Sequence, residues 1–478
     1  MAKGLKSLAL HKLTKTNARR LFSEIVESVS GTDQDFTSGK LGKAILLLSV
    51  PMVLEMVMES IFAVVDIFFV SKLGADAIAT VGITESLMTL VYALGFGLSM
   101  GTTALVSRRI GEKKTGEASS VGFQAIVLGI FISLLIAIPG MFYASEILGL
   151  MGASRVMQEE MAGYTAIILG GNMVIMLLFI INAVFRSAGD AAISMRVLWM
   201  ANILNIILDP ILIFGLGPIP ALGIEGAAIA TTIGRGLAVV YQFYLLFNGH
   251  KRVQLHWREL KLDFPVMGRL IRLSLGGIGQ NIIATSSWIG LVRIIAEFGS
   301  VAMAGYTIAI RILIFSLLPS WGIANAAATL VGQNLGAKKP GRAEKSVWVT
   351  GRINMILLTF VGLMFVLYPS FFVGLFTTNL EIVRAGSLAL RVVSIGSMAY
   401  GYGMVMIQAF NGAGDTLTPT WINLFCIWLL EIPLAYMLAM VLGLGEKGVY
   451  LSILTAESVL ALVAYILFRR GKWKLKVV

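Results

Sequence analysis

The sequence predicts an all-α membrane protein with 12 transmembrane helices in two parallel six-helix lobes. Three observations predict this fold: an apolar composition, basic residues gathered on one side of the predicted membrane, and an internal repeat. Of the 478 residues, 57% are hydrophobic and only 13% are charged, and the mean hydropathy is +0.86. A soluble domain must cover its surface with polar groups, so this composition excludes an ordinary soluble protein.

Apolar stretches of about 20 residues, the length that spans roughly 30 Å of hydrocarbon, recur from residue 41 to residue 468. They predict helices at 42–70, 78–107, 119–143, 161–185, 194–216, 223–248, 267–296, 302–331, 346–370, 385–410, 417–442 and 448–468. The first residues lack a compact apolar run and a cleavage site, so we expect a tail rather than a signal peptide. The predicted organisation is an N-terminal tail (1–41), an N-lobe (42–249), a linker (250–266), a C-lobe (267–468) and a basic C-terminus (469–478).

The basic residues predict the topology. If successive connections alternate sides, 29 of the 38 Lys and Arg fall on the side shared by both termini. Only Lys72, Arg155, Arg384 and Lys447 fall on the other side. This positive-inside pattern places both termini in the cytoplasm and the protein in the plasma (cytoplasmic) membrane as a multi-pass protein. The net charge of +12 is therefore attributed to topology, and no nucleic-acid partner is expected.

Three pairs of segments repeat at one offset, which is 225. LVSRRIGEKKTGEA (105–118) matches LVGQNLGAKKPGRA (330–343), LGADAIATVGI (73–83) matches FGSVAMAGYTI (298–308), and FRSAGD (185–190) matches FNGAGD (410–415). An even number of helices per half returns the chain to its starting side, so the halves are predicted to be parallel repeats. Two lobes of this kind suit alternating access to a central site.

Acidic residues distinguish the first half from the second. Asp66 and Asp209 have Leu291 and Leu434 as their counterparts at the repeat offset. Side chains three, four or seven positions apart share a helical face, which predicts two stripes, one of Glu55, Glu59, Phe62 and Asp66 and one of Asn202, Asn205 and Asp209. A carboxylate against lipid is costly, so both stripes are expected to face protein or water.

If the two stripes face each other, they line one cavity in the first lobe. Apolar surroundings and neighbouring carboxylates favour the protonated form of an aspartate there. Sodium bound by Asp66, Asn205 and Asp209 is the alternative, so the expected coupling ion is H⁺ or Na⁺, with no organic cofactor. Pro210 lacks an N–H group, which predicts a bend and a freed carbonyl at Ile206.

The repeated loop, the paired AGD turns and VVDIFFVSKLGADAIATVG (64–82) resemble the multidrug and toxic compound extrusion (MATE) family over residues 42–468. In the DinF-like branch of that family, cation coupling is attributed to two first-lobe carboxylates and an asparagine four residues before the second. Asp66, Asn205 and Asp209 match those positions. The resemblance implies further cation or substrate neighbours, namely Asn172, Asn182, and either Thr231 or Thr232.

The NorM-like branch instead uses a glutamate and an aspartate of the second lobe. This chain has Gln280 near the first position and no acid in the predicted helix 385–410. Those departures favour the DinF-like branch. Glu59, where an amide is expected, makes the cavity more acidic.

Structural interpretations compete with these functional ones. Asp209 could act as a hydrogen-bonded group beside the bend, Asp66 could pair with Arg196 or Lys72, and Glu55 could pair with a first-lobe arginine. Arginines inside helices are more often structural partners than substrate contacts. In the second half, we expect Glu431 and Glu457 to neutralise some of them.

The predicted function is a secondary active antiporter that exchanges H⁺ or Na⁺ for amphipathic, often cationic small molecules. It is expected to be a monomer in the lipid bilayer, without ATP and without enzymatic activity. A flippase for lipid-linked oligosaccharides or lipids, from the same superfamily, is the alternative. A membrane enzyme would need a reactive constellation, which the sequence does not offer, and the duplicated lobes argue against a channel.

Overall fold

The computed structural model describes residues 19, 21–249, 252–256 and 261–478. The long helices of the first half are α2 (Leu41–Ser71), α3 (Ala75–Gly111), α4 (Thr115–Phe142), α7 (Ala162–Gly170) with α8 (Asn172–Ala188), α9 (Ala191–Phe214) and α10 (Gly223–Asn248). Two short helices, α5 (Ala144–Leu150) and α6 (Arg155–Glu160), lie between α4 and α7. The six helices predicted for this half are confirmed, with ends that shift by a few residues.

The second half repeats this order. Its helices are α11 (Phe264–Ala296), α12 (Ser300–Gly336), α13 (Pro340–Leu367), the short α14 (Pro369–Gly374), α15 (Leu380–Ser394) with α16 (Ser397–Gly412), a segment of α17 (Leu417–Asn423), η2 (Leu424–Glu431), α18 (Ile432–Tyr436) and η3 (Met437–Val441), and α19 (Glu446–Arg469). A short 3₁₀ turn, η4 (Lys472–Leu475), follows α19. The linker residues 250–251 and 257–260, and residues 1–18 and 20 of the predicted tail, lie outside the described residues.

Membrane-spanning length and apolarity are met by most of these helices. Among the described residues, nine helices are long and apolar enough to cross a membrane, or ten if the pair α15 and α16, bent by 57°, counts as one span. The two other long helices, α2 and α11, have 31 and 33 residues and pack within the same bundles. The chain is therefore a multi-pass membrane protein.

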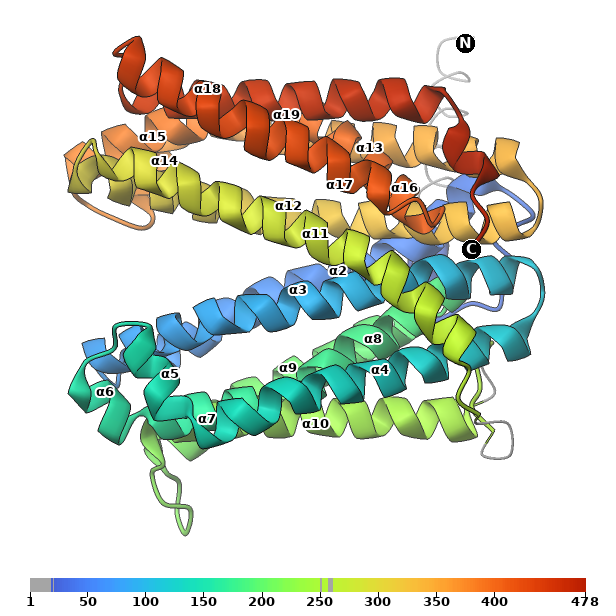
Figure 1. Ribbon diagram of the computed structural model, residues 1–478, viewed down its shortest axis with the longest axis horizontal. Helices are drawn as coiled ribbons and strands as arrows, with labels where there is room; N and C mark the ends of the chain where they lie inside the picture. Colours follow the sequence, from blue (N-terminus) through green and yellow to red (C-terminus); the bar gives the residue numbers. More distant parts are fainter. Residues whose placement is uncertain (1–18, 20, 250–251, 257–260) are drawn as a thin grey trace, which may run out of the picture.

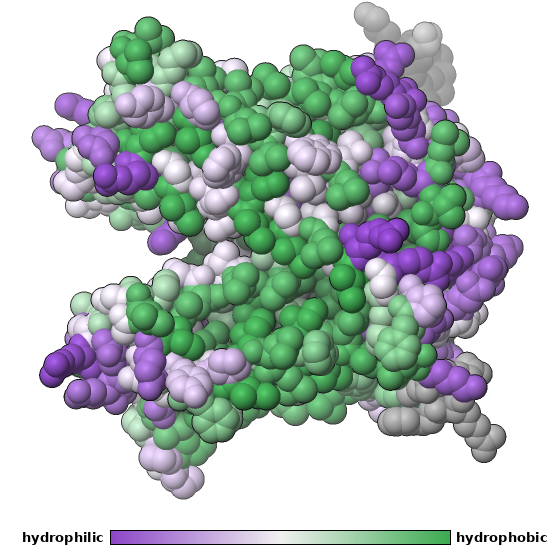
Figure 2. All heavy atoms as spheres, in the orientation of Figure 1, coloured by the Kyte–Doolittle hydropathy of each residue, from purple (hydrophilic) through white to green (hydrophobic). Residues whose placement is uncertain are grey.

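The helices form two bundles that diverge from one end of the molecule (Figure 1). The N-lobe contains α2 to α10 and the C-lobe contains α12 to α19, while α11 crosses from the N-lobe to the C-lobe at the joined end. A cleft between the bundles opens at the opposite end, beside α6 and α14 (Figures 1 and 2). We call these the closed end and the open end. Hydrophilic residues gather at both ends, and apolar residues cover much of the face between them (Figure 2).

The backbone repeats with the same offset that the sequence shows. Three pairs of turn residues have positive φ in both halves: Gly74 (105°) and Gly299 (91°), Lys113 (61°) and Lys338 (58°), and Gly189 (100°) and Gly414 (84°). The fourth helix of each half also breaks at equivalent glycines, Gly171 between α7 and α8 and Gly396 between α15 and α16. The two lobes are thus copies of one fold at the level of individual turns.

The lobes touch at the closed end through the last turns of α3 and α12. A Cβ atom on Gly111 would overlap the carbonyl oxygen of Gln333, and one on Gly336 would overlap the carbonyl oxygen of Arg108. Arg108 donates from Nη2 to the Ala413 carbonyl at 3.3 Å, and Gln333 donates to the Ser187 carbonyl at 2.8 Å. Each lobe therefore reaches across to the C-terminal end of the other lobe's fourth helix.

A segment before α2, which we call the strap (residues 30–40), joins both lobes at the closed end. On the C-lobe side, Arg342 donates to the carbonyls of Phe36, Ser38 and Gly39, with the shortest distance 2.6 Å to Ser38, and Lys339 donates to Thr37 at 2.8 Å. On the N-lobe side, Arg252 donates to the Gln34 carbonyl at 2.6 Å and to the Ala188 carbonyl at 3.0 Å. The side chain of Phe36 is fully buried beneath these contacts.

The strap contains a turn held by Asp35. Its Oδ1 accepts from the Thr37 backbone N–H at 2.8 Å and from the Thr37 hydroxyl at 2.7 Å. Partial burial raises the pKa of Asp35, but the hydrogen bonds from Thr37 and the charge of Lys113 outweigh it, so the net pKa lies below the ordinary value. Asp35 is therefore charged, and the turn is formed, at neutral pH.

Candidate functional site

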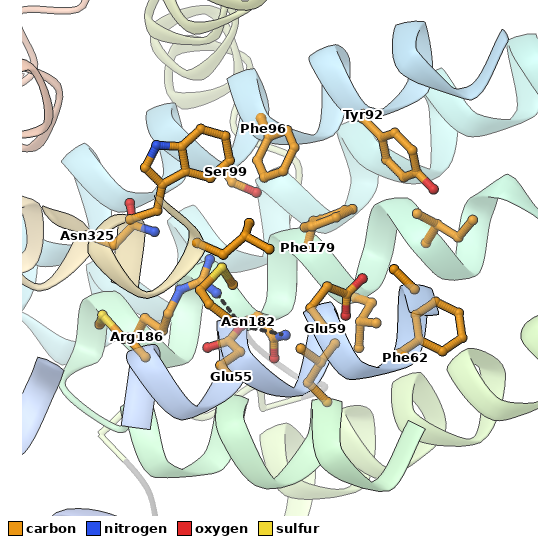
Figure 3. Close-up of a pocket in the computed structure, with 18 of the residues that line it drawn as sticks. Glu55, Glu59, Phe62, Tyr92, Phe96, Ser99, Phe179, Asn182, Arg186 and Asn325 are labelled. Carbon is orange, nitrogen blue, oxygen red and sulfur yellow. Dashed lines mark hydrogen bonds and ion pairs between the residues drawn. The ribbon is translucent and has the colours of Figure 1, made fainter. Parts of the chain in front are cut away.

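A cavity of about 560 Å³ lies between the lobes, with walls from α2, α3, α7, α8, α9 and α10 of the N-lobe and α11, α12 and α16 of the C-lobe. The four residues of the predicted stripe on α2, Glu55, Glu59, Phe62 and Asp66, all line it. Figure 3 shows Glu59 and Phe62 on α2 facing Tyr92 and Phe96 on α3 across this space. The cavity wall is thus acidic on one helix and aromatic on the next.

Glu55 is held in a buried ion pair. Its Oε1 lies 2.6 Å from Nη1 of Arg186 on α8, and its side chain is only 3% exposed. Asn182 donates to the same oxygen at 3.5 Å, and Gln242 on α10 donates to the Asn182 carbonyl oxygen at 2.7 Å. The structure therefore supports the interpretation of Glu55 as the partner of a first-lobe arginine (Figure 3).

Glu59 is also paired, although less tightly. Its Oε1 lies 3.5 Å from Nη2 of Arg235 on α10, and its Oε2 accepts from Asn202 on α9 at 3.1 Å. The Arg235 guanidinium lies over the ring of Phe62, 5.4 Å from its centre. Glu59 is therefore the counterion of a buried arginine as well as part of the cavity wall.

Asp209 lies behind the cavity wall rather than on it. Its side chain is fully buried between α9 and its neighbours, and Asn205 is 2% exposed. In the amide orientation that satisfies all partners, Asn205 donates to Asp209 Oδ2 at 2.9 Å and accepts from the Thr231 hydroxyl at 2.9 Å. Thr231 itself lines the cavity, so it joins the buried Asn205–Asp209 pair to the open space.

Asp66 has no ion pair among the described residues. The two predicted structural partners point elsewhere, because Lys72 lies over the Phe68 ring at 4.5 Å and Arg196 donates to the Ser30 carbonyl. Asp66 and Asp209 lie on neighbouring helices, because α2 and α9 pack against each other. The structure thus brings together the acidic pair on α2 and α9, one carboxylate in the cavity and one behind it.

Other predicted neighbours lie apart from this group. Asn172 donates to the carbonyls of Ser133 and Leu169, at 3.2 and 2.6 Å, and Thr232 donates to the Ala228 carbonyl at 2.8 Å. These bonds are within helices or between neighbouring helices, and neither residue lines the cavity. Gln280 lies in the C-lobe, where it donates to Asn411 and to the Thr416 carbonyl, each at 3.1 Å.

Pro210 lies inside α9, which continues as one helix to Phe214. Its effect on the direction of α9 stays a prediction. Breaks are found instead at Gly171 and Gly396, the equivalent positions of the two halves.

The prediction for the second-half glutamates is wrong. Glu431 accepts from the Ser287 hydroxyl at 3.3 Å, and Glu457 has a buried oxygen with no hydrogen-bond partner. Among the described residues, neither forms an ion pair, while Arg293 pairs at 3.3 Å with Glu297, the residue that follows the end of α11. In the same residues, no group of three or more His, Cys, Asp or Glu side chains could hold a metal ion.

Sequence reasoning missed Glu85 and the C-lobe wall. Glu85 on α3 lines the cavity, as do the amides Asn281, Asn325, Gln408 and Asn411. The signal for Glu85 was available, because its counterpart at the repeat offset is Ile310. The amides carried no such signal, since amides are common in both halves.

Two repeated helical lobes around a polar and aromatic cavity, in a multi-pass membrane protein, are the features of a membrane transporter. The model of the MatE family matches residues 51–211 and 278–437, one segment in each half. The chain belongs to the MATE family, which is a family of transporters and not of enzymes.

Curated relatives extend over nearly the whole chain. It is 25% identical to the probable multidrug resistance protein NorM of Thermotoga maritima, over 92% of this chain and 94% of that protein. It is 24% identical to the multidrug export protein MepA of Staphylococcus aureus, over 90% and 94%. It is also 24% identical to an FAD transporter of Shewanella oneidensis, over 91% and 95%.

Solved structures share the fold. A multidrug resistance MATE family transporter of the MOP superfamily, in an outward-facing conformation, superposes with a TM-score of 0.86 at 25% identity. The match covers 92% of this chain and 98% of that one.

Proposed function

We propose that this protein is a secondary active antiporter that exports amphipathic, often cationic small molecules in exchange for H⁺ or Na⁺. The observation that carries the proposal is the cavity itself, lined by four carboxylates (Glu55, Glu59, Asp66 and Glu85) and two guanidinium groups (Arg186 and Arg235). Both arginines pair with glutamates, which leaves Asp66 and Glu85 as excess negative charge. A cavity of that sign attracts cations.

The rest of the lining suits varied apolar ligands. Aromatic rings come from α2, α3, α8 and α12, for example Phe62, Phe96, Phe179 and Trp321, and methionines from α2 and α3. Aromatic faces attract cationic groups, and flexible methionine side chains adapt to different shapes. Relatives named as multidrug resistance or export proteins support the same substrate class.

Asp66 and Asp209 are the proposed coupling groups. Asp66 faces the cavity and so meets the cation first, while Asp209 is reached through Thr231 and Asn205. A charged carboxylate inside the membrane is costly unless water or a partner compensates it. Binding a cation there neutralises the charge, which changes the relative free energies of the two lobe arrangements.

The gradient is sufficient for accumulation. One elementary charge that crosses 100 mV gains about 2.3 kcal/mol, which corresponds to a factor of roughly 50 in the concentration ratio of the substrate.

The positive-inside bias supports a cytoplasmic closed end, because the strap and the C-terminus both lie there. In this orientation the cleft faces outwards.

The test is export of a fluorescent cationic dye from proteoliposomes under an imposed pH gradient or an imposed Na⁺ gradient. Wild-type protein is expected to export dye under at least one gradient. The rate of dye export is expected to be at least tenfold lower in Asp66→Asn and in Asp209→Asn. Asp76→Asn is the matched control, because Asp76 is an exposed aspartate in the first turn of α3. Loss in all three variants would point to misfolding instead.

The same preparation separates the alternative. If wild-type protein moves no dye under either gradient but transfers a fluorescent lipid-linked sugar between leaflets, the protein is a flippase. The arginines of the cavity are paired and its unpaired carboxylates are in excess, which argues against a lipid-linked sugar that carries negative charge.

A further inference from the structure

Arg235 is a buried cation in the cavity wall whose hydrogen bonding is incomplete. It lies on α10 and is 6% exposed. Its Nη2 is 3.5 Å from Glu59 Oε1, longer than a close ion pair, and its Nε is buried without a hydrogen-bond partner. Leaving a buried donor unpaired costs free energy. Arg186, by contrast, makes a close pair with Glu55 at 2.6 Å.

Acidic groups from two other helices line the same cavity as Arg235. Glu59 and Asp66 come from α2, and Glu85 comes from α3 beside Tyr92. Of these carboxylates, Glu59 is the one that Arg235 contacts, at 3.5 Å, and Asp66 and Glu85 share the cavity with it. Asp66 and Glu85 form no ion pair in the described part of the chain. The Arg235 guanidinium is therefore the positive charge available to them as well as to Glu59.

The remaining helices packed against α10 contribute mainly amides and hydroxyls, and Asp209, the carboxylate of α9, is buried and accepts from Asn205 at 2.9 Å. Asn202 of α9 holds the second oxygen of Glu59, at 3.1 Å. Asn182 of α8 is bonded to Gln242 of α10 at 2.7 Å, and Tyr164 of α7 lines the same cavity. The second guanidinium, Arg186, is taken by Glu55. Arg235 is therefore the cation that compensates the excess acids of the N-lobe cavity.

A resident cation affects Na⁺ and H⁺ differently. Na⁺ needs several oxygen ligands at once, and a fixed guanidinium repels it in a medium of low dielectric constant. Arg235 also occupies one oxygen of Glu59, which Na⁺ would otherwise use. A proton needs only one carboxylate oxygen and no ligand shell.

We infer that Arg235 is the resident cation of the N-lobe cavity and that it excludes Na⁺, so that H⁺ is the coupling ion. This inference rests on the proposed antiport function and names its ion. It makes Arg235 a specificity-determining residue for the ion, acting through charge rather than through contact with the transported molecule.

The test measures binding of ²²Na⁺ to purified protein at pH 8, without transport. The variant Arg235→Gln/Glu59→Gln replaces the ion pair by two neutral amides and leaves Asp66 and Glu85 in place. We expect its Na⁺ affinity to exceed that of wild type at least tenfold. Glu55→Gln/Arg186→Gln is the matched control, because it neutralises the other cavity pair, and its Na⁺ affinity should equal that of wild type.

A charge-conserving variant protects the test against misfolding. Arg235→Lys keeps the cation and is expected to bind Na⁺ as weakly as wild type. Equal Na⁺ affinity in wild type and Arg235→Gln/Glu59→Gln, both monodisperse, overturns the inference, and so does tight Na⁺ binding by wild type. Because the assay involves no dye, failure of dye export would defeat the proposed function and still leave the Na⁺ result decisive for Arg235.

Discussion

At the scale of single residues, the N-lobe cavity separates carboxylates that are neutralised from carboxylates that are not. Glu55 and Glu59 lie one turn apart on α2, and each has its own arginine. Asp66, two turns further along the same face, has none among the described residues. Within each ion pair the two charges cancel, so Asp66, Glu85 and the buried Asp209 are the groups left to change charge.

The pair of Glu55 and Arg186 is expected to be a stability element. Arg186→Leu leaves the Glu55 carboxylate buried without a partner, which costs about 3–5 kcal/mol for a buried pair. Glu55→Gln/Arg186→Gln should recover most of that loss. Thermal unfolding in detergent, followed by tryptophan fluorescence, measures both. Arg293→Gln is the control, since its pair with Glu297 is exposed and worth at most about 1 kcal/mol; equal losses for Arg186→Leu and Arg293→Gln would contradict the prediction.

The sequence predicted the acidic stripe on α2 because four-residue spacing on a helix does not depend on tertiary structure. It also predicted the Asn205–Asp209 neighbourhood, since those residues are one turn apart on α9. It could not predict that Asp209 would lie behind the cavity wall, because the rotation of α9 depends on how α2 and α10 pack. The expectation that arginines inside helices are structural partners covers Arg235, and only the structure shows its incomplete hydrogen bonding in the cavity wall.

At the scale of helices, the closed end depends on glycine. Gly111 at the end of α3 and Gly336 at the end of α12 are equivalent positions of the internal repeat, and each touches the backbone of the other helix. Hydropathy predicted these helices but ended both several residues early, because the last turns carry polar residues and are stabilised by the partner lobe. The periodicity of apolar residues cannot reveal such a contact between lobes.

Adding a methyl group at either glycine is expected to wedge the lobes apart. Overpacking of this kind costs about 1–3 kcal/mol, a factor of roughly 5–150 in the population of the closed end. Gly111→Ala and Gly336→Ala should therefore slow dye export at least fivefold in proteoliposomes. The control variants are Gly116→Ala and Gly341→Ala, a second equivalent pair, which have nothing within 4 Å and should transport at the wild-type rate. Slowing in the control pair as well would show that glycine flexibility, not contact, is what matters.

At the scale of the whole molecule, the strap links both lobes at the closed end and must release if that end is to open. Arg342 binds three strap carbonyls from the C-lobe, and Arg252 binds the strap from the N-lobe. Nothing in the hydropathy of the first residues indicated this role, because the contacts are to backbone carbonyls. The predicted tail is therefore, in its last part, a structural element.

Removing the hydrogen bonds between Arg342 and the strap is expected to shift the protein towards the state in which the open end is closed. Hydrogen bonds from a charged group contribute about 1.5–3 kcal/mol each, so Arg342→Ala should change the ratio of the two states at least tenfold. Spin labels at Arg155→Cys and Thr378→Cys, two exposed positions at the open end, report the distance between lobes. Lys345→Ala, which removes an exposed base from the same helix, is the control, and an unchanged distance distribution in Arg342→Ala would refute the role of the strap.

The same labels test the pH dependence of the strap. The lowered pKa of Asp35 means that its contribution is complete above about pH 4, the ordinary range of an aspartate, and is lost only as the pH falls below it. The distance distribution should therefore not respond to Asp35 between pH 6 and pH 8. Asp35→Asn removes this titratable carboxyl group. Between pH 6 and pH 8, its distance distribution should therefore change with pH in the same way as that of wild type. A response in this window that Asp35→Asn abolishes would contradict the assignment.

The most direct measurement is ion flux coupled to dye flux in the same vesicles. Proteoliposomes that contain a pH indicator receive a cationic dye on one side, with no imposed gradient of H⁺ or Na⁺. The dye flux and the proton flux are recorded together. Wild-type protein is expected to move protons against the direction of the dye, and Asp209→Asn to move neither at more than a tenth of that rate. Dye flux in wild type with no opposing flux of H⁺ or Na⁺, or undiminished coupling in Asp209→Asn, would contradict antiport through the N-lobe carboxylates.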